Sequence, residues 1–122
     1  WSNGALSIAN QKANLQDLEL QLKEKKESTE LEIQNSVKNI EQAQAQLNVL
    51  ESNVQLAQKR YNMTLTAYNH GSKDLLTLQN ASDALMTARD NLNSQKIKIF
   101  SAILELENIL GVPFGTLGKT DN

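Results

Sequence analysis

Apolar residues recur every seven positions over most of this sequence, and this repeat limits the possible folds more than any other feature. In the first half, the repeat contains Ile33, Ile40, Leu47, Val54, Tyr61 and Tyr68, with Ala43, Leu50 and Ala57 between them. In the second half, it contains Leu78, Leu85, Leu92, Ile99 and Leu106, with Ala81, Ala88, Ala102 and Ile109 between them. Alternating spacings of three and four residues place such side chains in one stripe along an α-helix. The pattern predicts two helices packed as a coiled coil, whose alanines let the backbones approach closely.

Residues that break helices gather at only three places: before and at Gly4, around Gly71, and from Gly111 onward. The sequence between them predicts a long helix over about residues 6–68, a turn at 69–73, a shorter helix over about 74–110, and a tail at 111–122. Gly71 is expected to cap the first helix in the left-handed conformation, and Gly111 with Pro113 to end the second. Because a short turn makes neighbouring helices antiparallel, we expect an all-α fold in which residues 1–122 form a single long antiparallel two-helix coiled-coil hairpin.

A second apolar stripe lies away from this seam. It contains Val49, Leu56 and Met63 on the first predicted helix, and Ile97, Phe100 and Leu104 on the second. A free-standing hairpin needs only one apolar seam, so a second stripe indicates neighbours on two sides, as in a sheet or barrel of helices. The alternative is that these residues only widen the stripe into the broad apolar face of an ordinary bundle helix.

The first predicted helix is much longer than the second, so its beginning has no partner within the hairpin. If the helices pair from the shared turn, roughly 40 Å of the first helix, about residues 6–32, stays unpaired at about 1.5 Å per residue. This stretch still contains Leu15, Leu18, Leu22 and Leu31. We therefore expect that another segment covers these leucines: either the native chain is longer, or this part self-associates.

Composition and charge exclude several classes of function. The formal net charge of −2 provides no basic surface for nucleic acid. The absence of cysteine excludes disulfides and zinc–thiolate sites, and the single histidine, His70, has no partner for a metal or catalytic site. No apolar run approaches the roughly 20 residues that a membrane-spanning helix needs. We expect a protein that is not an enzyme and has no catalytic residue, metal or cofactor.

The turn and the second predicted helix carry a characteristic order of residues. The order is Tyr68, Asn69, His70 and Gly71, then Asp74, Leu75 and Leu76, then Leu85, Ala88 and Leu92, and finally Leu106, Leu110 and Gly111. With its spacings, it resembles the C-terminal part of a repeat in the outer-membrane efflux protein family, the TolC family. Upstream, the segment from Trp1 to Gly4 resembles the end of a barrel strand followed by the start of a long helix. The resemblance covers nearly the whole chain.

The resemblance implies a function as well as a fold. The chain would be one periplasmic hairpin of a trimeric outer-membrane channel for drug efflux or type I secretion, and part of its helical barrel. The tip of the hairpin would engage a periplasmic adaptor protein and an inner-membrane transporter, and a short helix elsewhere in the full chain would cover the unpaired leucines. The alternative function is a coiled-coil hairpin of a periplasmic membrane-fusion adaptor, or a scaffold coiled coil that binds a partner helix.

The resemblance also implies functional residues at the tip. In the family, a tyrosine, a basic residue and carboxylates near the tip tie neighbouring coiled coils together and hold the entrance closed. Tyr68 and Gly71 match this motif directly, while Lys73 would stand for the basic residue and Asp74 for one carboxylate. The sequence departs from the pattern in its short tip and in Thr77, which occupies a position where a second acid is expected. Structural roles are the alternative: Asp74 as a helix cap, Lys73 as a solvated turn residue and Tyr68 as the last seam residue.

Overall fold

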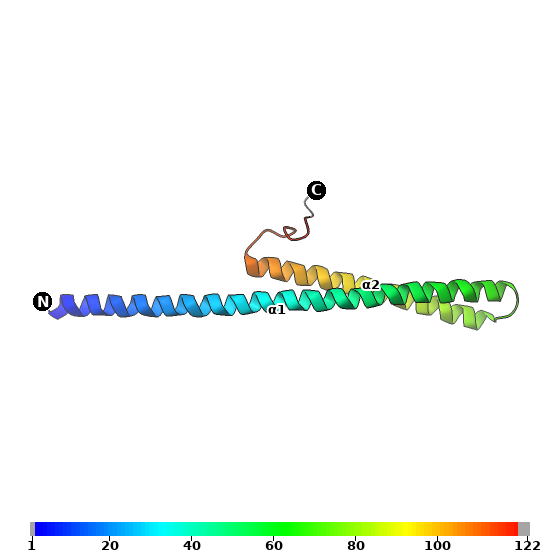
Figure 1. Ribbon diagram of the computed structural model, residues 1–122, viewed down its shortest axis with the longest axis horizontal. Coiled ribbons are helices and arrows are strands. Elements are labelled where there is room, and N and C mark those ends of the chain that lie inside the picture. Colours follow the sequence, from blue (N-terminus) through cyan, green and yellow to red (C-terminus); the bar gives the residue numbers. More distant parts are fainter. Residues whose placement is uncertain (1, 120–122) are drawn as a thin grey trace. The chain divides into compact units, whose positions relative to one another are not determined.

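The computed structural model describes residues 2–119 and contains two α-helices, α1 (Ser2–Asn69) and α2 (Leu75–Leu110), with no strand in that range (Figure 1). The chain divides into two compact units, Trp1–Asn35 and Ser36–Asn122. The first unit consists of the beginning of α1. The second contains the remainder of α1, the turn, α2 and the tail that follows it. The prediction of an all-α fold with two helices joined as a hairpin is confirmed.

Helix α1 begins at Ser2, earlier than the start expected near residue 6. We expected a strand end and a non-helical segment before the helix, but Ser2, Asn3 and Gly4 are helical, and Trp1 lies outside the described residues. A glycine inside a helix costs only about 1 kcal/mol relative to alanine, so one glycine does not end a helix that is otherwise favourable. Gly4 also has open space around it, since an added Cβ would meet no atom within 4 Å.

The first unit exposes all of its large aliphatic side chains except Ile33. Each of these is more than half exposed: Leu6, Ile8, Leu15, Leu18, Leu20, Leu22 and Leu31. Local polar pairs such as Gln21 Nε2 donating to Asp17 Oδ2 (3.1 Å) stabilise a helix only slightly. The leucines of the stretch that the sequence predicts to be unpaired, about residues 6–32, are therefore exposed.

In the second unit, α2 lies alongside the later part of α1 and runs in the opposite direction (Figure 1). The covered seam positions of α1 in this unit are Ser36, Ile40, Ala43, Leu47, Leu50, Val54, Ala57, Tyr61 and Thr64. Those of α2 are Leu78, Ala81, Leu85, Ala88, Leu92, Gln95, Ile99, Ala102 and Leu106. Both series alternate spacings of three and four residues, so the predicted seam is confirmed here. It also includes three polar positions that the apolar pattern could not reveal: Ser36, Thr64 and Gln95.

At most levels of the seam, the order of these positions places a large side chain opposite a small one. Matched outward from the turn, Tyr61 is level with Ala81 and Ala57 with Leu85, and this alternation fills the space between two closely packed helices. Thr64 is then level with Leu78, whereas the sequence predicts Tyr68 as the last seam residue. Tyr68 is instead 38% exposed, so the seam closes about one helical turn earlier than expected.

Two side-chain hydrogen bonds join the helices and fit this register. Arg89 Nη2 donates to Gln58 Oε1 (2.7 Å) at the exposed margin of the seam. Gln95 Nε2 donates to the backbone carbonyl of Ala43 (3.0 Å) within it. Gln95 is only 8% exposed, although its neighbours along the seam are apolar. A buried amide without a partner costs about 1–3 kcal/mol, so the bond to Ala43 makes this polar position tolerable.

We predict that Gln95→Leu raises the free energy of unfolding by about 1 kcal/mol, because a polar seam residue costs stability while it specifies one register. The Ala43 carbonyl retains its bond within α1, so the substitution leaves no acceptor unsatisfied. Urea titration followed by helical circular dichroism at fixed protein concentration measures the change. Gln95→Ala is the matched control and should lower stability, since it removes packing as well as the hydrogen bond. A Leu variant less stable than the original chain would contradict this account.

Candidate functional site

The turn that follows α1 is shaped by Gly71, which has a left-handed φ of 78°. The Ser72 N–H donates to the Ala67 carbonyl (2.9 Å), and the Gly71 N–H donates to the Tyr68 carbonyl (3.0 Å). This pair of bonds is a Schellman motif, which satisfies carbonyl groups left without partners at a helix end. The prediction that Gly71 caps the first helix in the left-handed conformation is confirmed.

Asp74 is the N-cap of α2, with the extended backbone that this position requires. Its Oδ1 accepts hydrogen bonds from the Thr77 backbone N–H (2.9 Å) and from the Thr77 hydroxyl. The hydrogen bond from the Thr77 side chain, followed by the one from its backbone, lowers the pKa of Asp74 below its ordinary value, and Lys73 contributes least. The predicted cap is therefore confirmed, and Thr77 is its partner.

The four tip residues predicted from the sequence lie within one short segment, but their polar groups do not converge on one another. Gly71 contacts Tyr68 through the backbone, and the Asp74 carboxylate bonds with Thr77. Lys73 is exposed. The role of Thr77 was not predicted from the sequence, because the resemblance implies an acid at this position. Its position three residues after the cap is the signal that identifies it as a capping partner.

The tip also presents apolar surface. Leu75 and Leu76, at the start of α2, are both more than half exposed, and the Tyr68 side chain is partly exposed at the end of α1. His70 in the turn is exposed as well. Among residues 2–119, no cluster of histidines or acids suited to a metal ion is present.

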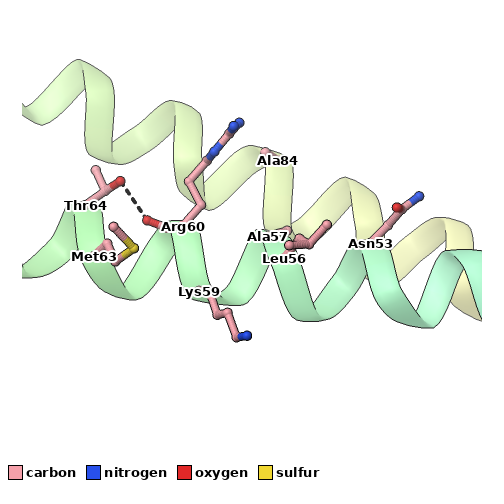
Figure 2. Close-up of a pocket in the computed structure, with 8 residues that line it drawn as sticks. All are labelled: Asn53, Leu56, Ala57, Lys59, Arg60, Met63, Thr64 and Ala84. Atoms are coloured by element: carbon pink, nitrogen blue, oxygen red, sulfur yellow. Dashed lines mark hydrogen bonds between the residues drawn. The ribbon is translucent and has the colours of Figure 1, made fainter.

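A shallow groove lies between α1 and α2 in the second unit, with a volume of about 640 Å³. Its lining residues are Asn53, Leu56, Ala57, Lys59, Arg60, Met63, Thr64 and Ala84 (Figure 2). Ala57 and Ala84 leave room because their side chains are small. Figure 2 shows Lys59 and Arg60 pointing away from α1 in different directions. The groove therefore combines an apolar surface with two cations at its margin, which suits a helix that carries both apolar and acidic residues.

The second apolar stripe of the sequence supplies part of this groove. Its α1 members Val49, Leu56 and Met63 are exposed, and Met63 is 74% exposed. On α2, Ile97 and Phe100 are also exposed, whereas Leu104 is partly covered. Five of the six stripe residues thus lie outside the seam between the two helices. Such a regular row of exposed apolar side chains is characteristic of an interaction surface.

The capping geometry predicts how the start of α2 depends on pH. A lowered pKa means that the ionised Asp74 is favoured in the folded chain, so its stabilising effect is present above the ordinary value of 3.8 and is lost as the pH falls through the lower, folded-state pKa. The Thr77 amide chemical shift should therefore titrate with a midpoint below 3.8. Asp74→Asn should cap without titrating, and a Thr77 shift that still follows pH in this variant would contradict the assignment.

Within residues 2–119, neither helix has a stretch long and apolar enough to cross a membrane.

Comparison with known proteins identifies the family. The sequence pattern of the outer membrane efflux protein family matches residues 2–112, which include both helices and the tip. No match to the chain was found among curated proteins or among solved structures. Members of this family are oligomeric outer-membrane channels and not enzymes. The chain therefore belongs to the outer membrane efflux protein family, and it is a component of an outer-membrane efflux channel.

Proposed function

We propose that this chain is a periplasmic hairpin of a trimeric channel for drug efflux or type I secretion. Neighbouring hairpins pack side by side into a helical barrel, and the tip at residues 69–73 faces a periplasmic adaptor protein and an inner-membrane transporter. The leucines of the first unit pack against a short helix supplied elsewhere in the full chain. Family membership supports this proposal over the alternative of a membrane-fusion adaptor or a scaffold coiled coil.

The observation that carries the proposal is the exposed stripe Val49, Leu56 and Met63. These side chains repeat every seven residues, as the seam does, yet they lie beside the seam and stay more than half exposed when α1 is paired with α2. Each apolar side chain moved from water into a contact contributes about 1.5–3 kcal/mol. A helix that keeps such a row exposed is suited to a second neighbour as well as to its hairpin partner.

The groove supports a helical partner in particular. Because two alanines are among its lining residues, another helix can approach closely, as small residues allow in helix packing. Lys59 and Arg60 favour acidic residues on the partner, and such charges set orientation and specificity more than affinity.

At the tip, Tyr68, Gly71, Lys73 and Asp74 are proposed to form part of a closure between neighbouring hairpins. Gly71 gives the turn its left-handed geometry and so places Lys73 and Asp74 at the end of the hairpin. Lys73 is exposed and available for a carboxylate on a neighbour. The Asp74 carboxylate has one oxygen bonded to Thr77, which leaves its other oxygen for a donor on a neighbouring hairpin.

The stripe can be tested in the full-length protein with the double substitution Leu56→Glu and Met63→Glu. Burying two new carboxylates in a helix–helix contact is unfavourable, so drug accumulation in cells should rise towards the level without the channel. The helical content should stay unchanged, because both positions lie outside the seam. Gln55→Glu, at an adjacent exposed position, is the matched control and should transport normally. Full transport by the double variant would show that this stripe has no neighbour in the working channel.

Substitutions at Asp74 can distinguish a role in closing the channel from a role as a helix cap. If its charge helps to hold the entrance closed, Asp74→Asn in the full-length channel should increase conductance without a docked transporter, although Asn caps a helix about as well as Asp. Asp74→Ala should add loss of the cap, visible as fraying at the start of α2. If conductance does not increase in the Asn variant while α2 frays in the Ala variant, Asp74 acts only as a structural cap.

A further inference from the structure

Glu107 is the most completely covered large side chain in the described part of the chain, with an exposure of only 1%. It lies one helical turn before the end of α2. Charged residues are almost never fully buried unless their charge has a partner. The seam does not account for this burial, because Leu106 already occupies the seam position at this level. A carboxylate buried at a helix end therefore requires its own explanation.

The tail after α2 turns back toward Glu107. Gly111, at a left-handed φ of 69°, donates its N–H to the Asn108 carbonyl (3.2 Å), and Val112 donates to the Glu107 carbonyl (3.1 Å). A further turn is closed by the Thr116 N–H and hydroxyl, which both donate to the Pro113 carbonyl. After this turn, the Leu117 N–H lies 3.5 Å from Glu107 Oε2 and donates to it.

We propose that Glu107 is a clasp that holds the tail, residues 112–119, against the end of α2 and so fixes the direction in which the chain leaves the hairpin. The Schellman cap directs only Gly111 and Val112, because its two bonds end there. The bond from Leu117 spans ten residues and acts through the side chain. With this clasp closed, a displacement of the end of α2 carries the tail with it.

The chemistry of the clasp suits a backbone donor. A carboxylate oxygen accepts hydrogen bonds from backbone N–H groups, and the bond from Leu117, at 3.5 Å, is a long one. The tail contains backbone N–H donors. Its turn at Pro113–Thr116 orients the Leu117 N–H toward the Glu107 carboxylate. The Glu107 side chain is also covered, since it is only 1% exposed.

The test compares Glu107→Ala with Glu107→Gln in the intact chain by amide hydrogen exchange. The Ala variant should speed exchange of the Leu117 amide by about tenfold or more, because that amide loses its acceptor. The Gln variant keeps a side-chain carbonyl at the same reach and should retain most of the protection. The Val112 amide is the internal control, since it bonds to the backbone of residue 107 in all three chains. Unchanged protection of Leu117 in the Ala variant would overturn the proposal.

A second variant covers the case in which Glu107→Ala unravels the end of α2, seen as lost Val112 protection. Leu117→Pro removes only the donor N–H and leaves α2 untouched. Backbone order parameters of residues 114–116 should then fall below 0.6, the range of flexible backbone, while those of residues 100–110 stay near 0.85. A tail that remains as ordered as in the unchanged chain would show that packing, and not the Glu107 bond, holds it.

Discussion

The close contact between α1 and α2 in the second unit depends on alternation of large and small side chains along one seam. Where α1 supplies Tyr61, α2 supplies Ala81, and where α1 supplies Ala57, α2 supplies Leu85. Two backbones that approach closely leave limited space in each layer, and most layers of the seam hold one large and one small side chain. The register and the surfaces that remain outside the seam follow from this packing.

Because the seam is narrow, the second unit keeps much of its apolar surface outside. Met63 on α1 and Phe100 on α2 have no place in a two-helix contact, and both are exposed. In an ordinary globular domain, such residues would enter the core. Members of the outer membrane efflux protein family assemble as oligomeric channels, and this exposed row is the surface through which we propose that each hairpin contacts a neighbour.

The polar residues of the second unit act mainly on backbone geometry. Gln95 bonds to the Ala43 carbonyl across the seam, Asp74 caps α2 through Thr77, and Glu107 accepts from Leu117 in the tail. Each of these side chains satisfies a backbone group or is satisfied by one, and no buried side-chain nitrogen or oxygen among the described residues lacks a partner. These bonds fix where helices begin, how they register and how the chain leaves them.

The hairpin and its seam were predictable from the sequence, because the period of seven, Gly71, Asp74 and Gly111 each act through local backbone geometry. The start of α1 was misplaced, since the turn signal of Ser2, Asn3 and Gly4 is weaker than the helical preference of the residues that follow. The burial of Gln95 and Glu107 could not be predicted from the sequence either. A glutamine or glutamate in a helix is expected to face solvent, and only the packing shows what surrounds it. Local spacing thus determined the two helices and their caps. Only the tertiary structure decided the register, the buried polar groups and the path of the tail, because each depends on residues far apart in the chain.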